Sequence, residues 1–389
     1  MASRGASLVS RCMARTFSSS ASSLGEVPVI DLRPALLGEP PAALVREMAS
    51  ACEGWGFFQV VNHGLDSGLR ARFESQMRAF FALDMGVKRQ IKRDGGNARG
   101  WYDDELTKQR RDWKQGLDIG MPASRSWAVP DDHPSNANLD GYNRLPPPRL
   151  LPDFRPTIVE YFEASTRISE RLALIMALGL GLPQDYFSKQ LRDTHTSYLR
   201  MNYYPVCKDL GQSDGPPPLG ISPHKDAGFL TVLAQDEDCH SLQVRRRTDD
   251  AWVTVVPVPG ALTINTGDMA QIWSNDRYYA PEHRVLTHPE KERYSAPFFY
   301  NPGYQTSVAP SAELGESPQY SPCFWGYFRA QRFAGDFADY GSEIQISDFS
   351  SGRSDDWHVN NQARFLQQAD FGEPFDLEVN RGLLARPPA

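Results

Sequence analysis

The chain lacks several features that mark whole classes of protein. No stretch approaches the roughly 20 consecutive apolar residues that cross a bilayer, so an integral membrane protein is not expected. The chain has no long basic run and carries a net charge of −7, which argues against nucleic-acid binding. The five cysteines are scattered and form no CxxC pair, so a disulfide scaffold or a cysteine-rich zinc site is not expected and a reducing compartment is favoured.

The composition favours a folded protein with many short strands. The 389 residues are 40% hydrophobic, which is enough for a large core in one domain or two. Glycine and proline occur 30 times each, and both residues punctuate turns. A chain with this many turns is expected to contain many short elements.

Residues 1–25 differ in composition from the rest of the chain. They contain Arg4, Arg11 and Arg15, many serines and no acidic residue. A helical wheel places the three arginines in one narrow sector, which is typical of an organelle transit peptide. We expect import into the mitochondrion, with the plastid as the second destination. The alternative is a disordered basic tail on a cytoplasmic protein.

The remaining chain divides by pattern into four regions. Residues 26–150 form a mixed N-terminal region, 151–192 a long supporting helix, 193–305 a strand-rich core, and 306–389 a C-terminal helix and tail. Eight closely spaced strands in the core predict a β-sandwich or jelly roll, so the fold class is mainly β with flanking helices. Apolar spacing predicts helices over residues 42–51, 67–83, 153–180 and 323–341. It predicts strands over residues 28–32, 57–61, 196–204, 229–235, 242–246, 252–256, 262–265, 270–273, 282–287 and 293–300.

Three side chains in the core are candidate metal ligands. His224 and Asp226 are two residues apart, so in a strand they project from one face while Lys225 points away. His283 lies in another predicted strand. Two imidazoles and one carboxylate on one face form the facial triad of non-haem iron oxygenases, which leaves coordination positions open. A surface pair at 224/226 and a hydrogen-bonded core histidine at 283 are the alternatives.

Arg293 and Ser295 have the same two-residue spacing in the next predicted strand. The polar residues 288–292 indicate a hairpin loop between the two strands. An odd loop length would place His283 across from Ser295, with Arg293 on the same face. A small dicarboxylate could then bridge the metal and the guanidinium, because arginine donates two parallel hydrogen bonds to a carboxylate.

Across residues 27–345 the chain resembles the plant- and fungal-type 2-oxoglutarate/Fe(II) dioxygenases, the isopenicillin-N-synthase-like group. The order and spacing of the matching motifs make the resemblance specific. The motifs are PVIDL (28–32), GFFQVVNHG (56–64), ARGWY (98–102), DWKQGLDIG (112–120), LRMNYYP (199–205), HKDAGFLTVLAQD (224–236), LQV (242–244), NTGDMAQIWSN (265–275), EHRVL (282–286) and RYSAPFF (293–299).

The resemblance implies a double-stranded β-helix whose residues 193–305 form the Fe(II)/2-oxoglutarate catalytic core. It implies iron ligation by His224, Asp226 and His283, and it gives His63 no ligand role. It implies that 2-oxoglutarate is bound by Arg293 and Ser295, with Asn202 and Tyr204 close by. The expected activity is oxidation of a small-molecule metabolite of secondary metabolism by O₂, through hydroxylation, desaturation or ring closure, with release of succinate and CO₂. Ascorbate is expected to stimulate the reaction, and the protein is expected to be a monomer.

The substrate wall is the least specified part of the site. We expect it from Arg99, Trp101, Tyr102, Phe298 and Phe299, and the basic side chains near residue 99 suggest a carboxylate substrate. Three departures from the family pattern, at Lys225, Gln115 and residues 279–281, avoid the ligands but weaken any assignment of substrate by analogy. The alternatives to this activity are a same-fold Fe(II) oxidase that does not use 2-oxoglutarate and a non-catalytic jelly-roll binding protein.

Overall fold

The computed structural model describes residues 26–108, 110–208, 218–315, 317–337, 343–353 and 355–384. The predicted transit peptide, residues 1–25, therefore lies outside the described residues. No helix in the described ranges is long and apolar enough to cross a membrane. The four cysteines in these ranges are all free and buried.

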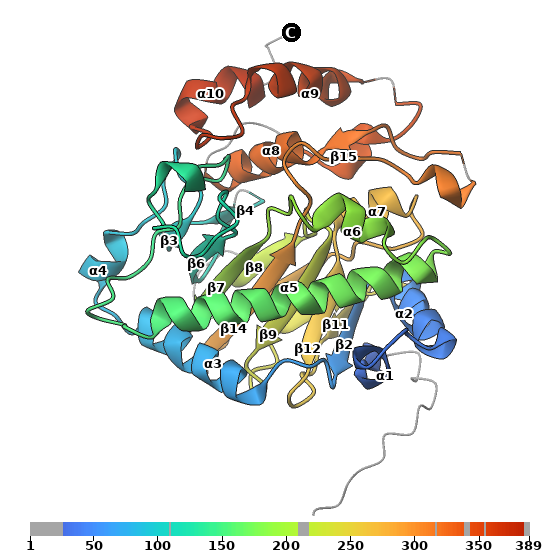
Figure 1. Cartoon of the computed structure of the whole chain (residues 1–389). Coiled ribbons are helices and arrows are strands. Elements are labelled where there is room, and N and C mark those ends of the chain that lie inside the picture. Colours follow the sequence, from blue (N-terminus) through green and yellow to red (C-terminus); the bar gives the residue numbers. More distant parts are fainter. Residues whose placement is uncertain are drawn as a thin grey trace, which may run out of the picture.

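Two facing β-sheets form the centre of the molecule (Figure 1). The larger sheet has the order β1-β2-β12-β9-β14-β7-β6-β3, and the smaller one has the order β11-β10-β13-β8. This arrangement is the expected double-stranded β-helix, or jelly roll. The strands of the larger sheet are β1 Val29–Asp31, β2 Phe57–Val61, β12 Leu262–Thr266, β9 Leu230–Gln235, β14 Arg293–Tyr300, β7 Tyr198–Tyr204, β6 Gln115–Gly120 and β3 Gly100–Tyr102. Those of the smaller sheet are β11 Trp252–Thr254, β10 Leu242–Arg245, β13 His283–Leu286 and β8 Leu219–His224.

Alternation along the strands produces two separate cores. In β14, the side chains of Tyr294, Ala296 and Phe298 belong to the large core under the helices. The intervening Arg293 and Ser295 face the cavity between the sheets. Because successive side chains of a strand point to opposite faces, one strand supplies both surfaces.

Helices cover the outer face of the larger sheet. The 26-residue α5 (Phe154–Gly179) packs against β9 and β14, with α2 (Ala42–Gly54) and α3 (Ser67–Phe81) packed against it. A continuous stripe of buried apolar residues holds α5 on the sheet, and Figure 1 shows it running across that face.

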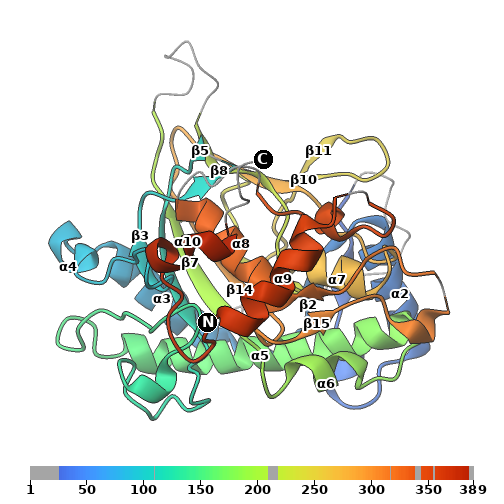
Figure 2. The ribbon, with the colours of Figure 1, turned by 90° about the horizontal axis from the view of Figure 1, so that it is seen from above.

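A second helical layer covers one end of the barrel. α8 (Trp325–Phe337) lines the cavity between the sheets. α9 (Trp357–Gln368) and α10 (Leu377–Leu384) pack against α8, and Figures 1 and 2 show them on its outer side. The backbone carbonyl of Leu384 accepts a hydrogen bond from Gln331 Nε2 of α8 at 3.0 Å. The tail after residue 352 therefore continues into helices that fix α8 in place.

The remaining elements are short. They are α1 Arg33–Leu36, α4 Met85–Arg89, α6 Tyr186–Leu191, α7 Asp268–Trp273, the 3-10 helices η1 Pro134–Asn136, η2 Ala312–Leu314 and η3 Ile346–Phe349, and the two-stranded pairs β4 Leu106–Thr107 with β5 Arg110–Arg111 and β15 Ser307–Val308 with β16 Cys323–Phe324.

Two sequence expectations are wrong. Residues 270–273 belong to the helix α7, not to a strand, because a short run in which every apolar side chain is buried has no periodicity that separates the two. The predicted hairpin between residues 282–287 and 293–300 does not form. β13 lies in the smaller sheet and β14 in the larger one, so residues 287–292 cross between sheets. His283 is paired with His224 of β8, not with Ser295.

Gly267 holds the start of α7 against the segment that carries Asp226. A Cβ at Gly267 would clash with the carbonyl oxygen of Gly228 and lie 2.9 Å from that of Asp226. The next amide, that of Asp268, donates to the Asp226 carbonyl at 2.8 Å. This close approach of two backbones requires a residue without a side chain.

We therefore expect Gly267→Ala to lower the free energy of unfolding by about 1–3 kcal/mol, because neither backbone can move away easily. It should also displace residues 226–228. Gly38→Ala is the control, since a Cβ there meets no atom within 4 Å. Thermal unfolding of both variants measures the difference, and equal stabilities would contradict the close-approach explanation.

Candidate active site

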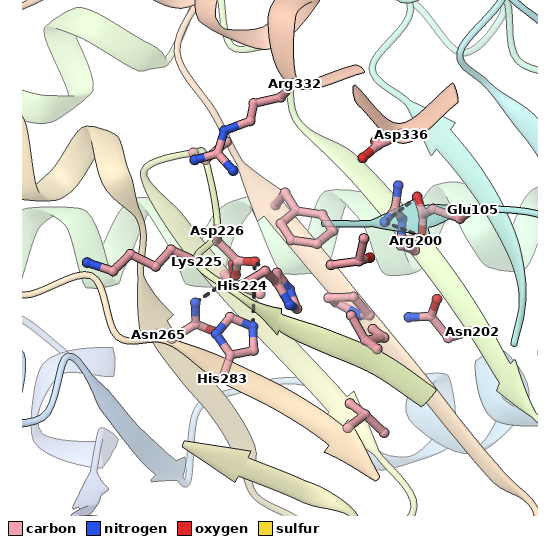
Figure 3. A pocket seen from close by; sticks show the side chains of 18 of the residues that line it. Glu105, Arg200, Asn202, His224, Lys225, Asp226, Asn265, His283, Arg332 and Asp336 are labelled. Atoms are coloured by element: carbon pink, nitrogen blue, oxygen red, sulfur yellow. Dashed lines mark hydrogen bonds and ion pairs between the residues drawn. The ribbon is translucent and has the colours of Figure 1, made fainter. Parts of the chain in front are cut away.

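Three side chains converge at one end of the cavity between the sheets. His224 is the last residue of β8, Asp226 follows two residues later, and His283 begins β13. Their candidate ligand atoms all lie within 4.8 Å of one another. Figure 3 shows the two imidazoles and the carboxylate turned toward one point, with the Lys225 side chain directed away from it.

The pairing of β8 with β13 creates this convergence. His224 and His283 are direct cross-strand partners, and their ring centroids are 4.3 Å apart. Asp226 Oδ1 lies 3.7 Å from His224 Nε2 and 3.6 Å from His283 Nε2. The expected geometric convergence of the three residues is therefore present, although it depends on a different strand pairing from the predicted one.

Backbone carbonyls orient both imidazoles. His224 Nδ1 lies 2.8 Å from the Ser222 carbonyl oxygen, and His283 Nδ1 lies 3.2 Å from that of Pro281. Each Nδ1–H thus donates to a carbonyl, which leaves each Nε2 lone pair directed at the shared point. Burial, followed by the neighbouring His283, lowers the pKa of His224 to about 3, so this imidazole is neutral.

Two donors hold the Asp226 carboxylate. Its Oδ2 accepts hydrogen bonds from Thr231 Oγ1 at 2.5 Å and from Asn265 Nδ2 at 2.7 Å, which leaves Oδ1 facing the imidazoles. Burial alone would raise the pKa of Asp226, but the two histidines and these hydrogen bonds outweigh it and lower the pKa. Two imidazole nitrogens and one carboxylate oxygen on one side suit a divalent iron ion with open positions.

A buried cation lies deeper in the same cavity. Arg293 is 2% exposed, and its Nη2 donates to Gln235 Oε1 at 2.7 Å. Its Nε and Nη1 are buried and have no hydrogen-bond partner in the described part of the chain. A buried guanidinium with unused donors requires an anion that accepts their hydrogen bonds and neutralises the positive charge.

The strands beside Arg293 add further polar groups. Strand pairing places Tyr204 opposite Arg293 and Asn202 opposite Ser295. The guanidinium carbon lies 5.0 Å from the centre of the Tyr204 ring, and Asn202 Nδ2 lies 3.5 Å from Ser295 Oγ. All four residues line the cavity that also contains the metal-ligand candidates. A dicarboxylate with one end at the metal and the other at Arg293 fits this donor set.

The residues expected on the substrate wall are only partly brought together. Phe299 lines the cavity. Its neighbour Phe298 points to the other face of β14 and packs on Phe162 of α5, with the two ring centroids 4.9 Å apart. Alternation along β14 separates the two.

Arg99, Trp101 and Tyr102 lie away from the cavity lining. Trp101 Nε1 donates to Gln115 Oε1 at 3.2 Å, and the Tyr102 hydroxyl donates to Asp118 at 3.3 Å. Arg99 is buried, and its Nη1 donates to the Met121 carbonyl at 3.2 Å. These side chains pack around β6 and do not form the expected substrate wall.

The sequence analysis missed the contribution of α8. Trp325, Arg329, Arg332 and Asp336 of this helix line the cavity opposite the strands. Their steps of four, three and four residues place them on one helical face, but a charged face of this kind is typical of an exposed helix. Figure 3 shows Arg332 and Asp336 projecting from α8 above the three converging residues.

A buried ionic cluster, formed by Arg93, Glu105, Lys114, Asp118 and Arg200, borders the cavity on the side of β6. Glu105 pairs with Lys114 at 2.5 Å, Arg200 at 3.1 Å and Arg93 at 3.4 Å. Arg200 also donates to both oxygens of Asp118 at 2.8 Å each. The cluster contains three cations and two carboxylates, so it carries a net positive charge.

Two protein-family models match the chain. One, described as the 2OG-Fe(II) oxygenase superfamily, matches residues 195–302, and the other, described as the non-haem dioxygenase in morphine synthesis N-terminal, matches residues 27–148. The chain is 34% identical to jasmonate-induced oxygenase 2 of Arabidopsis thaliana, over 78% of each chain. It is 31% identical to an oxoglutarate-dependent flavonoid 7-O-demethylase of Ocimum basilicum, over 76% of this chain and 74% of that one.

Solved structures share the fold. The structure of JOX2 in complex with 2OG, Fe and JA matches with a TM-score of 0.65 and 31% identity, over 80% of this chain and 86% of that one. The dioxygenase for auxin oxidation in rice matches with a TM-score of 0.63 and 26% identity, over 84% of this chain and 100% of that one. Both matches extend over most of each chain, which supports the expected double-stranded β-helix.

Asn265 provides a test of the second layer of contacts around Asp226. We expect Asn265→Ala to weaken Fe(II) binding by about 10- to 100-fold, because Asp226 loses a donor that orients it. Gln243→Ala on β10 is the control, since Gln243 lies outside the cavity lining. Anaerobic Fe(II) titration measures both affinities, and unchanged binding in the Asn265 variant would contradict the orienting role.

Proposed function

Because the chain belongs to the 2OG-Fe(II) oxygenase superfamily, we propose that His224, Asp226 and His283 bind its iron and that Arg293 and Ser295 bind 2-oxoglutarate. The protein is a 2-oxoglutarate- and Fe(II)-dependent dioxygenase, an oxidoreductase that acts on a small molecule with O₂ as the second cosubstrate.

The observation that carries the residue assignment is the unsatisfied guanidinium of Arg293. Its Nε–H and Nη1–H groups are buried without partners in the described residues, in the cavity that contains the metal-ligand candidates. A carboxylate would accept both hydrogen bonds and neutralise the charge. The Ser295 hydroxyl, two residues along the same face, is available as a further donor.

The residues of the chain have separable roles in this proposal. When bound, iron with 2-oxoglutarate and O₂ supplies the oxidation of an unactivated C–H bond, with succinate and CO₂ as coproducts. His224 and His283 each present an imidazole nitrogen, and Asp226 provides a carboxylate oxygen. Arg293 orients the cosubstrate from the far end. The apolar side chains of Leu233 and Val285 line the space between these groups and exclude water from it.

We expect Arg293→Ala to raise the KM for 2-oxoglutarate by about 100-fold or more, since charge-assisted hydrogen bonds are lost. Iron binding should stay intact, because Arg293 does not contact the metal-ligand candidates. Anaerobic titration with Fe(II) and then 2-oxoglutarate, followed by the weak visible charge-transfer band, separates the two effects. An unchanged KM would refute the role of Arg293.

A same-fold oxidase that does not use 2-oxoglutarate would have to satisfy Arg293 with a carboxylate of its own substrate. Succinate formed in a one-to-one ratio with oxidised product distinguishes the dioxygenase, and product without succinate would identify the oxidase.

We also propose that the substrate carries an acidic group recognised by α8. The Nε–H groups of Arg329 and Arg332 are buried and lack a hydrogen-bond partner in the described ranges. Asp140 lies 3.3 Å from Arg329 Nη2 and Asp268 lies 2.8 Å from Arg332 Nη2, so buried carboxylates fix both side chains from behind. A structure of the 31% identical JOX2 contains JA, and the small-molecule class is consistent with it.

Arg329→Gln should raise the KM for an acidic substrate by about tenfold, while the KM for 2-oxoglutarate stays constant. Arg110→Gln is the matched control, because Arg110 is exposed on β5. Candidate compounds are compared as free acids and as methyl esters by the succinate release that they stimulate. Esters that are turned over as well as their acids by the unsubstituted enzyme would contradict the proposal.

A further inference from the structure

We propose that Asp336 selects the substrate by accepting a hydrogen bond from a donor group, a hydroxyl or an amine, at the end of the substrate remote from the iron. This inference rests on the proposed function, because it assigns a substrate contact in the same cavity. It adds a second polar requirement to the substrate.

Asp336 occupies a position that a substrate can reach. It lies on the face of α8 that lines the cavity, one helical turn beyond Arg332. In Figure 3 its carboxylate projects from the helix toward the cavity, on the side of Glu105 and Arg200 and above the metal-ligand candidates. A molecule held near the iron would extend toward it.

Asp336 differs from the other carboxylates that line the cavity. Glu105 is paired within the buried ionic cluster, and Asp226 accepts hydrogen bonds from Thr231 and Asn265. Glu343 pairs with Lys108 at 2.9 Å and also with Arg332. Asp336 has no hydrogen bond or ion pair to any other described residue. Among these four carboxylates, that of Asp336 is therefore the unpaired one.

Two nearby cations, Arg200 and Arg329, form no hydrogen bond or ion pair with Asp336, because they have other partners. Arg200 donates to both oxygens of Asp118, and Arg329 is paired with Asp140. Burial, with the Glu105 carboxylate adding to it, raises the pKa of Asp336 to about 7 against the opposing effect of Arg93, Arg200 and Arg329. A partly desolvated carboxyl in this state gains from any donor that a ligand brings.

Aromatic side chains shape the path from the iron to Asp336. The rings of Tyr198 and Phe299 are stacked at a centroid distance of 4.6 Å, and Trp325 lines the same cavity. Flat walls favour a ring or another planar body in the substrate. The donor group is then expected on the far edge of that body.

A matched series of probes tests this inference. The probes are 3-phenylpropanoate with a 4-hydroxy, a 4-aminomethyl or a 4-methoxy substituent, which present a neutral donor, a cationic donor and no donor. Their dissociation constants are measured from the change each causes in the visible band of the anaerobic Fe(II)/2-oxoglutarate complex. The full-length enzyme should bind at least one donor probe about 10- to 100-fold more tightly than the methoxy probe, as expected for a hydrogen bond to a charged group.

Asp336→Ala, which removes both acceptor oxygens, should remove this preference, and Glu292→Gln, at an exposed carboxylate outside the cavity lining, should leave it unchanged. The hydroxy and aminomethyl arms show which donor is preferred. Asp336→Ala should also keep or raise the midpoint of thermal unfolding, because no described partner is lost. A large fall in that midpoint would identify a structural role and overturn the inference.

Equal affinity for donor and methoxy probes, including no binding of either, would also overturn the inference. The visible band recorded without a probe reports on iron and 2-oxoglutarate alone. If the unsubstituted enzyme shows this band but does not prefer the donor probes, only the role of Asp336 is refuted and the proposed function still holds. Absence of the band would be a failure of the proposed function itself.

Discussion

The structure depends on one constraint, the two-residue alternation of side chains along strands that face each other across a narrow space. In β7, β9 and β14, the outward positions are apolar and pack under helices, and the inward positions include Asn202, Thr231 and Arg293. A polar interior of this kind costs free energy unless bound groups complete its hydrogen bonds. The polar lining therefore suits a site that binds a metal ion and an anionic cosubstrate, and it does not suit a packed apolar core.

This constraint explains how far the sequence could predict the site. The spacing of His224 and Asp226, and of Arg293 and Ser295, is local, and local spacing fixes which side chains share a face. The partner of His283 is not local. It is set by the pairing of β13 with β8, and the short polar segment after β13 suggested a hairpin where the chain crosses to the other sheet. The three predicted ligands, His224, Asp226 and His283, do lie together, although the strand pairing predicted for His283 was wrong.

The substrate wall could not be predicted in the same way. Phe298 and Phe299 are adjacent in sequence, and the register of β14 decides which of them faces the cavity. Trp101 and Tyr102 sit on a strand at the edge of the larger sheet, where their hydrogen bonds tie them to β6. The charged residues of α8 have the pattern of a solvated helix face, and the packing of the barrel beneath and of α9 and α10 above makes that face interior.

Two parts of the chain consequently form the cavity. One part is a set of strands whose register aligns the candidate ligands, and the other is the helix α8. The candidate ligands and the cosubstrate residues lie on strands, or in the case of Asp226 two residues past the end of one, within residues 195–302. The oxygenase family model matches this range. Arg329, Arg332 and Asp336 lie beyond that range, on a helix that contributes no metal-ligand candidate. Substitutions on α8 can change which molecule is held near the iron without altering the strand register that aligns His224 with His283. The specificity of this enzyme is thus expected to depend on the segment that family membership describes least.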